Sequence, residues 1–469
     1  MHLWLQWWMQ VRQLRAAFSR KRTFLWFALC VAGMSVRKDL AGVTSIIRAL
    51  GLRDGFYDRL LDCFHSPAIN LDFLAVLWTK VILRCCARLL LVVNGRFVLL
   101  ADGLKAPKAG KKMPAVKKLY QESESNTKPK YIFGHSCQAI GIVAGFMETF
   151  FAIPLVCRIH EGVVFSNRDK RTLLDKMMEL LGTLLLQAPS YFVADAYYAS
   201  RNVIRKLLSS GHYHLVSRAR SNAVAYYPAA ASRIIRRGRK KIYGKKLKLK
   251  SLFADRQKFV MAASPVYGEL DTKLMYRCLD LLWRPVGVKV RFVLVIHPTR
   301  GKIILMSTDL TLSALEVVAL YGVRFKIEVS FKQAIHTVGT YAYHFWMAGM
   351  EKLSRSKSGN QHLHRRSQRY RDQVRRKMRA YHVHIMAGVI AQGMLQFLSL
   401  TQAKTVWKSF GSWIRTIRPG VLPSEQTVAV AMRNVMPEFL AVSDPNQTLA
   451  KFITERIDIS RSEGLALVA

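Results

Sequence analysis

Two short apolar runs in the middle of the chain each end in an aspartate, and they constrain the fold more than any other feature. The first, residues 96–102, is RFVLLAD and follows the turn signal Asn94-Gly95; the second, residues 191–195, is YFVAD. Runs of this length and apolarity are typical of strands buried on both faces. We therefore expect Asp102 and Asp195 at strand ends. An alternative for Asp195, which precedes a predicted helix, is a helix cap.

The segments between and around these runs predict a mixed α/β layer. We expect two or three antiparallel strands from the ranges 131–140, 141–151 and 153–159. Helices are expected at 170–186 and 197–209, a strand at 212–217 and a lysine-rich loop at 103–130. Residues 221–309 lose this order and predict a β-rich insertion. Beyond it, 346–469 is predicted to be helical, with an apolar helix at 384–400.

A third acid lies on a predicted helix whose start is marked by a capping box, Ser313 with Glu316. One face of this helix, within an arc of roughly 80°, carries a phenol, two cations and a carboxylate: Tyr321, Arg324, Glu328 and Lys332. The alternative to a functional face is a solvated one with an Arg324–Glu328 ion pair.

The chain is basic along its whole length, with 73 Lys and Arg against 29 Asp and Glu and a formal net charge of +44. A polyanion is the expected partner, with nucleic acid ahead of a membrane surface. The densest charge lies in 233–250. The residues predicted to contact DNA are Arg236, Arg237, Arg239, Lys240, Lys241, Lys245 and Lys246. A solvated basic loop is the alternative.

Residues 1–92 are predicted to be helical, with a helix at 36–50, a turn and a second helix at 56–64. A small DNA-binding domain fits, with basic residues outside, and a plain helical bundle fits nearly as well. The outward residues would be Arg37, Lys38, Arg48, Arg53 and Arg59. The apolar stretch 74–93 is long enough to span a bilayer, but a basic residue recurs every four positions. We expect an amphipathic helix there, and no membrane partner.

The seven cysteines form no CxxC pair, so we expect buried thiols in a reducing compartment. The N-terminus lacks a signal-peptide layout. A cytoplasmic protein is therefore expected, associated with the bacterial nucleoid through DNA.

Three carboxylates on separate elements of a basic protein suggest a metal site that acts on phosphate. Magnesium prefers hard oxygen ligands, and two such ions can hold the attacking and leaving oxygens of a displacement. Clustered carboxylates raise each other's pKa, and a bound cation removes that penalty. We expect Asp102, Asp195 and Glu328 to bind Mg²⁺, with Mn²⁺ as a substitute.

The chain resembles bacterial insertion-sequence transposases of the DDE type, which have a ribonuclease H-like core. The first acid ends the strand VLLAD102-G, and the second precedes an aromatic pair in FVAD195-AYY. The third lies in a Tyr-x2-Arg-x3-Glu-x6-Lys signature. Tyr321, Arg324 and Glu328 keep that spacing, but Ile335 occupies the lysine position and Lys332 lies one turn earlier.

This resemblance implies an α/β fold, a ribonuclease H-like mixed-sheet core with a β-rich insertion, flanked by helical ends. The expected parts are 1–92, a helical DNA-binding domain; 93–220, the first part of the core; 221–309, the insertion; 310–345, the helix with Glu328; and 346–469, the helical C-terminal region.

It also implies cut-and-paste transposition: Asp102, Asp195 and Glu328 as catalytic metal ligands, Tyr321, Arg324 and Lys332 beside them, and a homodimer on double-stranded DNA that holds inverted-repeat ends and target. The alternatives are a ribonuclease H-like nuclease without strand transfer, an inactive DNA-binding remnant, and a basic peripheral membrane protein.

Overall fold

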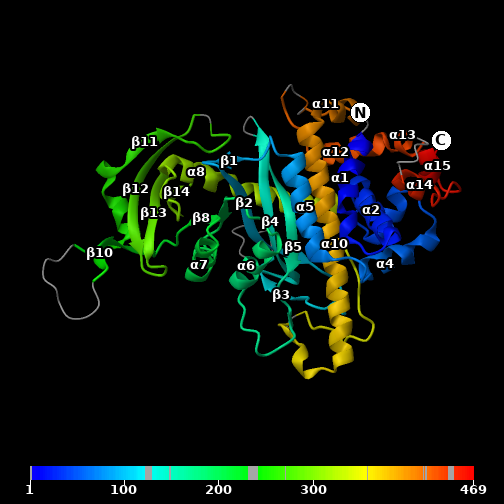
Figure 1. Ribbon diagram of the computed structural model, residues 1–469, viewed down its shortest axis with the longest axis horizontal. Coiled ribbons are helices and arrows are strands. Elements are labelled where there is room, and N and C mark those ends of the chain that lie inside the picture. The colour runs from blue at the N-terminus through cyan, green and yellow to red at the C-terminus, as the bar shows by residue number, and fades with distance from the viewer. Residues whose placement is uncertain are drawn as a thin grey trace.

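A computed structural model describes residues 3–121, 129–146, 149–230, 241–269, 271–355, 358–415, 417, 420–441 and 448–468. One long sheet runs from the insertion at one end of the molecule to a bundle of helices at the other (Figure 1). Both chain termini lie on the helical side, and the long helix α10 (Gln368–Thr401) stands between the sheet and that bundle.

Five strands form the centre of the sheet in the order β5, β4, β2, β7, β8. Their bounds are β2 Arg96–Pro107, β4 Tyr131–Phe146, β5 Thr149–Ile159, β7 Ser190–Ala194 and β8 Tyr213–Arg218. The first three strands along the chain pair antiparallel, and β7 and β8 then add parallel to β2. This is the strand order of a ribonuclease H-like core, so the expected fold class is confirmed.

The insertion continues this sheet. Strand β14 (Gly301–Ser307) pairs antiparallel with β8, and β13 (Val288–His297) pairs with β14. The remaining insertion strands are β9 Val224–Pro228, β10 Tyr243–Lys248, β11 Val260–Ala263 and β12 Lys273–Trp283. The predicted β-rich character of 221–309 is therefore confirmed for its described residues. Hydrogen bonding across β8 and β14 makes one 13-stranded sheet that also includes β1 (Val92–Val93) and β3 (Lys117–Tyr120).

Alternating side chains of the core strands bury both faces of the sheet. Val98 and Leu100 of β2 belong to the same buried cluster as Val193 of β7 and Val317 and Leu320 of α8 (Ala314–Val323). On the other side lie α6 (Leu173–Thr183) and α7 (Arg201–Ser209). Helix α8 begins at the Ser313–Glu316 capping box that the sequence predicts.

Helix α10 is the element on which both helical ends of the chain pack. It contacts β5, α2 (Lys21–Val36), α4 (Tyr57–His65), α5 (Leu71–Cys85) and α12 (Glu425–Asn434). The other helices of this part are α1 Leu3–Val11, α3 Val43–Ala49, α11 Ala403–Phe410, α13 Met436–Ala441, α14 Thr448–Thr454 and α15 Ser462–Val468. In the described part of the chain, α10 is the one helix long and apolar enough to cross a membrane, and its apolar window is wholly buried.

Several element boundaries differ from those predicted. The helix expected at 36–50 is two helices, because α2 ends at Val36 and α3 starts at Val43. The helix expected at 74–93 ends at Cys85, and the lysine-rich loop at 103–130 contains the end of β2 and all of β3. These polar residues form strands because they pair with β4. Neither their composition nor their periodicity predicts this pairing.

The cysteines are all free, as expected, and five are buried. Cys85 is half-buried and Cys278 is exposed, so the expectation of burial is wrong for Cys278.

Candidate active site

The two aspartates lie beside each other. The expected strand-end position is wrong for Asp102, because pairing with β4 continues β2 beyond it to Pro107. Strands β2 and β7 run parallel with Ala101 opposite Ala194, so the next residues of both strands, Asp102 and Asp195, are neighbours at one edge of the sheet. The Asp195 carboxylate accepts a hydrogen bond from the backbone N–H of Tyr197 at 3.0 Å. It does not cap α7, whose N-cap is Ser200. The capping alternative for Asp195 is therefore wrong.

Arg324 joins the first and third acids. It lies at the junction of α8 and α9 (Phe325–Gln333), where helical backbone angles continue. Its Nη1 donates to Asp102 Oδ2 at 2.7 Å and its Nη2 donates to Glu328 Oε1 at 2.6 Å. Each arm of the guanidinium thus binds one carboxylate, a charge-assisted geometry for which arginine is well suited.

The pKa of Asp102 is raised to about 6, mainly by burial, with the negative charges of Asp195 and Glu328 adding to the effect and Arg324 opposing it. Within the described residues, no group of three or more His, Cys, Asp and Glu side chains is close enough to hold a metal ion. Arg324 supplies the positive charge between Asp102 and Glu328 instead.

The other residues of the predicted helix signature occupy different environments. Tyr321 is half-buried, with the Arg324 guanidinium carbon 5.9 Å from its ring centroid, and burial raises the pKa of its phenol. Lys332 is exposed and makes no hydrogen bond or ion pair with any residue that the structure describes. Ile335 packs against the core in a π-helical turn, Ala334–Val338. At the position of the signature lysine, this chain therefore has an apolar side chain that packs against the core.

A hydrogen-bonded chain forms the floor beside the aspartates. His160 Nδ1 donates to Gln138 Oε1 at 2.6 Å, and the Gln138 amide donates to the Tyr198 hydroxyl at 2.9 Å. Burial lowers the pKa of His160 to about 3, so its ring is neutral. Since the Tyr198 oxygen already accepts, its hydrogen is left to donate. Burial, Asp102 and Asp195 all raise the pKa of this phenol.

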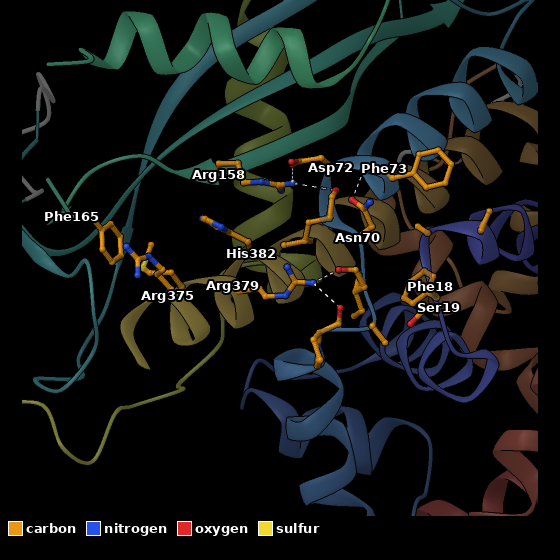
Figure 2. Close-up of a pocket in the computed structure, with 17 residues that line it drawn as sticks. Phe18, Ser19, Asn70, Asp72, Phe73, Arg158, Phe165, Arg375, Arg379 and His382 are labelled. Atoms are coloured by element: carbon orange, nitrogen blue, oxygen red, sulfur yellow. Dashed lines mark hydrogen bonds and ion pairs between the residues drawn. The ribbon is translucent and has the colours of Figure 1, made fainter. Parts of the chain in front are cut away.

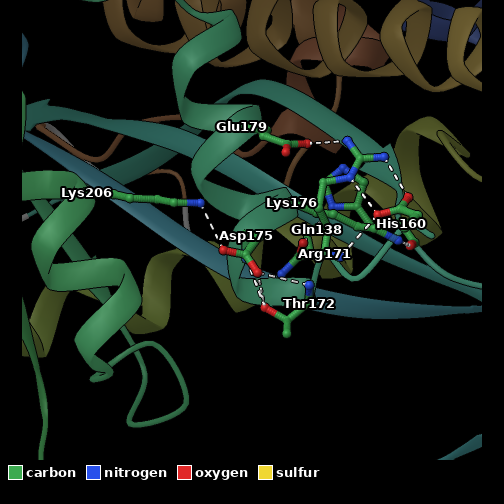
Figure 3. Close-up of polar contacts among 9 residues, drawn as sticks. Gln138, His160, Arg171, Thr172, Asp175, Lys176, Glu179 and Lys206 are labelled. Atoms are coloured by element: carbon green, nitrogen blue, oxygen red, sulfur yellow. Dashed lines mark hydrogen bonds and ion pairs between the residues drawn. The ribbon is translucent and has the colours of Figure 1, made fainter. Parts of the chain in front are cut away.

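Helix α6 holds this floor from one side (Figure 3). Lys176 Nζ donates to the His160 carbonyl at 2.7 Å. Two ion pairs hold α6 to its neighbours: Arg171, just before the helix, pairs with Glu179 at 2.8 Å, and Lys206 of α7 pairs with Asp175 at 2.9 Å. Sequence reasoning missed Gln138 and His160, since single polar residues in apolar strands carry no local signal of this partnership.

The aspartates open into a cavity of about 440 Å³. Its lining includes Asp102, Asp195, Tyr197, Tyr198, Lys105, Lys117, Lys118 and Glu161. Lys117 Nζ binds Glu161 Oε1 at 3.0 Å. A space lined by both acids and lysines can receive a phosphate group and position it against the carboxylates. In the sequence, only the lysine-rich composition of 103–130 could have pointed to Lys117 and Lys118 as site residues.

The predicted DNA-contacting cluster is described in part. Lys241, Lys245 and Lys246 are exposed, the latter two on β10 at the end of the sheet. The other four residues, Arg236, Arg237, Arg239 and Lys240, lie outside the described residues. β10 is an edge strand, and lysines there also keep other strands from adding to the sheet.

Residues 155–337 match the family model of the transposase DDE domain. The chain carries a transposase DDE domain. The match includes Asp195 and Glu328, while Asp102 lies before it on β2. DNA transposition is the activity of this class, whose members use divalent metal ions.

No curated protein matches the chain. Among solved structures, the chain is similar to a cryo-EM structure of the piggyBac transposase synaptic complex with hairpin DNA. The identity is 11% and the TM-score 0.37, over 96% of this chain and 81% of that one.

Proposed function

We propose that the chain is an insertion-sequence transposase that cleaves DNA at the ends of its element and joins the freed 3′ hydroxyl to target DNA. The observation that carries this proposal is the ion-paired set of Asp102, Arg324 and Glu328 beside Asp195. Three carboxylates and one cation beside a ribonuclease H-like sheet support a site that cuts and joins DNA. A merely solvated helix face would not bring Arg324 to Asp102.

The residues fit a divalent metal by the chemistry of their donors. Asp102, Asp195 and Glu328 offer hard carboxylate oxygens, and Arg324 already stands as a cation between two of them. These three acids would hold Mg²⁺, with Mn²⁺ as a substitute. Bound there, the ions would activate the attacking oxygen and stabilise charge on the scissile phosphate.

The chain's own side chains then bind and orient the DNA strand. Once its carboxylates are neutralised, Arg324 is free to turn its two N–H arms to phosphate oxygens. Lys105 and Lys117, which line the same cavity, hold the neighbouring phosphates. The Tyr198 hydroxyl donates a hydrogen bond from the floor, held in place by Gln138.

The remaining parts of the chain would serve DNA binding and assembly. We assign residues 1–92 to DNA binding, 93–220 and 310–345 to the core, 221–309 to contacts with the element end, and 346–469 to support of the core through α10. A homodimer that pairs two inverted-repeat ends fits cut-and-paste transposition in the cytoplasm, on the nucleoid.

The test changes each acid to its amide: Asp102→Asn, Asp195→Asn and Glu328→Gln. Each change keeps the side-chain size and removes a charge that holds metal. We expect Mg²⁺-dependent nicking of end DNA to fall by about 10²-fold or more, while affinity in a gel shift stays equal or rises slightly because a charge facing phosphate is removed.

Asp255→Asn is the matched control, since it removes one acid from the exposed surface of the insertion. It should nick at the parental rate. If one of the three amide variants also nicks at the parental rate, that acid is not part of the site. If the variants lose DNA binding together with cutting, the acids have a structural role. A pre-cut end that is never joined to target would favour a nuclease without strand transfer.

A further inference from the structure

A second cationic cleft lies away from the three acids, where the N-terminal helices meet β5 and α10 (Figure 2). It has a volume of about 750 Å³. One wall is formed by residues 16–19 and 67–73, and the other by Arg158 of β5 and by Arg375, Arg379 and His382 of α10. Figure 2 shows the His382 ring between the guanidinium groups of Arg158 and Arg379.

The two inner arginines are held by the protein but retain unused donors. Arg379 binds the carbonyls of Pro67 and Ile69 through Nη2 alone, and its buried Nε has no partner among the described residues. Arg158 donates to the Cys157 and Leu71 carbonyls. Since a guanidinium carries five N–H donors, both groups can bind a further acceptor.

His382 contributes a neutral donor to the same space. Its Nε2 accepts the backbone N–H of Ile159 at 3.1 Å. Nδ1 must therefore carry the ring proton, and in the described part of the chain it has no partner. Burial lowers the pKa of this imidazole well below its usual value, with Arg158 adding to the effect, so the ring acts as an uncharged N–H donor.

The charge of the cleft is not balanced from within. Asp72 is the single carboxylate of its lining, lies 3.6 Å from Arg158, and has a side chain that is 75% exposed. The first turn of α5, capped by Asn70, adds unpaired backbone N–H groups and the positive end of a 15-residue helix. Arg375 also pairs with Asp372, outside the lining, at 2.8 Å, but the three arginines still leave the charged groups of the cleft net positive.

We propose that this cleft binds a backbone phosphate of a DNA strand. DNA is favoured over a lone anion because the cleft is large enough for a nucleotide unit. A basic surface also leads away from it: Arg369, Arg371, Arg375 and Arg376 lie in the first turns of α10. Across the sheet, Arg158 pairs directly with Gln138 of the active-site floor. DNA held here would thus continue past the three acids, which makes the inference dependent on the proposed function.

The first test removes charge from the cleft and from a control site on another helix. Arg375→Gln/Arg379→Gln loses two cations of the cleft, whereas Lys404→Gln/Lys408→Gln loses two exposed cations of α11 outside its lining. We expect the cleft variant to bind a labelled duplex at least about 10-fold more weakly. Its salt slope should be lower by about one unit for each phosphate that the variant no longer neutralises. The control should bind less than about 3-fold more weakly than the parent.

The second test fills the cleft without changing any charge. Ser19 is exposed on its rim and its side chain makes no hydrogen bond in the described structure, so Ser19→Trp should fold normally, as a thermal melt would check. We expect it to weaken duplex binding as the arginine variant does. Parental affinity in this variant would show that DNA does not enter the cleft.

Both tests are made without divalent metal and in an Asp102→Asn background, so that the result does not depend on cleavage. Sodium phosphate is the second probe. If the cleft variants lose thermal protection by millimolar phosphate but keep parental duplex affinity, the cleft is a site for a free anion and the DNA assignment is overturned. If the parent protein does not nick DNA but these variants still lose duplex affinity, the cleft is a DNA-binding site and the proposed cleavage activity is wrong.

Discussion

The side chain of Asp102 is 19% exposed, and burial raises its pKa from 3.8 to about 6. A carboxyl whose folded pKa is raised binds its proton more tightly in the folded state. Its stabilising contribution is therefore complete below about pH 4 and is lost as the pH rises through 6. The difference is at most about 3 kcal/mol. The negatively charged acid is thus destabilising in the absence of metal.

We expect the metal-free protein to lose part of its thermal stability between pH 4 and pH 7, and the Asp102→Asn variant to lose less over the same range. The measurement is the melting temperature at each pH, compared between the two proteins because other groups titrate as well. Added Mg²⁺ should restore stability at pH 7 in the parent only. Equal pH profiles for the two proteins would show that Asp102 is well solvated.

Lys332 provides a second prediction at this scale. It is exposed one turn beyond Glu328, so Lys332→Ala should lower nicking by about 10-fold or more and leave the melting temperature unchanged. Ile335→Lys should instead lower the melting temperature, because Ile335 packs against the core. If Ile335→Lys raises nicking above the parental rate, Lys332 is a poor replacement for the signature lysine.

A residue from the N-terminal part of the chain, Arg37, binds the C-terminal end of the helix that carries Glu328. Arg37 donates from Nε to the Val338 carbonyl at 2.8 Å and from Nη2 to the Gly339 carbonyl at 2.7 Å. A cation here meets the negative end of the helix and satisfies carbonyls that the helix leaves free. Burial lowers the pKa of Arg37 to about 10, so it stays charged at neutral pH.

Arg37 was expected on the outside of a DNA-binding helix pair, and that expectation is wrong, since the residue is 4% exposed. We predict that Arg37→Met destabilises the protein by about 3 kcal/mol, because several buried carbonyls lose their donor. Nicking should fall more than DNA affinity does, because the helix that positions Glu328 loosens. Denaturant unfolding and a gel shift measure the two effects.

Exposed Arg53→Met is the control for this element. Its guanidinium donates to the Glu455 carbonyl and lies 5.2 Å from the centroid of the Phe56 ring, both at the surface, so its loss should change stability by less than about 1 kcal/mol. If Arg37→Met nicks at the parental rate despite lower stability, the contact is structural and does not position Glu328.

Across the whole molecule, the two helical ends form one body around α10. Trp4 of α1 donates to the Met432 carbonyl of α12 at 2.7 Å and stacks on Phe439. Residues near the N-terminus thus depend on the last helices for burial. The insertion is joined just as firmly, by the backbone hydrogen bonds between β8 and β14.

The charge of the insertion gives the prediction at this scale. Neutralising Arg236, Arg237, Lys240 and Lys241 together should reduce the salt slope of duplex binding by more than one unit, because each phosphate contact releases counterions. Changing Lys245 and Lys246 to Gln tests the described edge strand β10 separately. An unchanged slope in either variant would show that its residues face solvent when DNA is bound.

Local pattern was sufficient for the apolar runs of β2 and β7 and for the start of α8. The runs before Asp102 and Asp195 are apolar because parallel strands are covered on both faces, and the Ser313–Glu316 capping box uses residues three apart. Such signals depend on neighbours in the sequence, so they can be detected before any fold is known. The resemblance to DDE transposases rests on the same local motifs.

Tertiary structure alone decided which distant groups meet. Arg324 reaches Asp102 from 222 positions away, and Arg37 reaches Val338 from 301. In each pair, neither residue changes the sequence pattern around its partner. The same holds for the cleft between Arg158 and Arg379, whose walls come from the two ends of the chain and β5. A charged residue has the same local pattern whether it faces water, a carboxylate or a helix end, since burial and pairing are set by packing between distant segments.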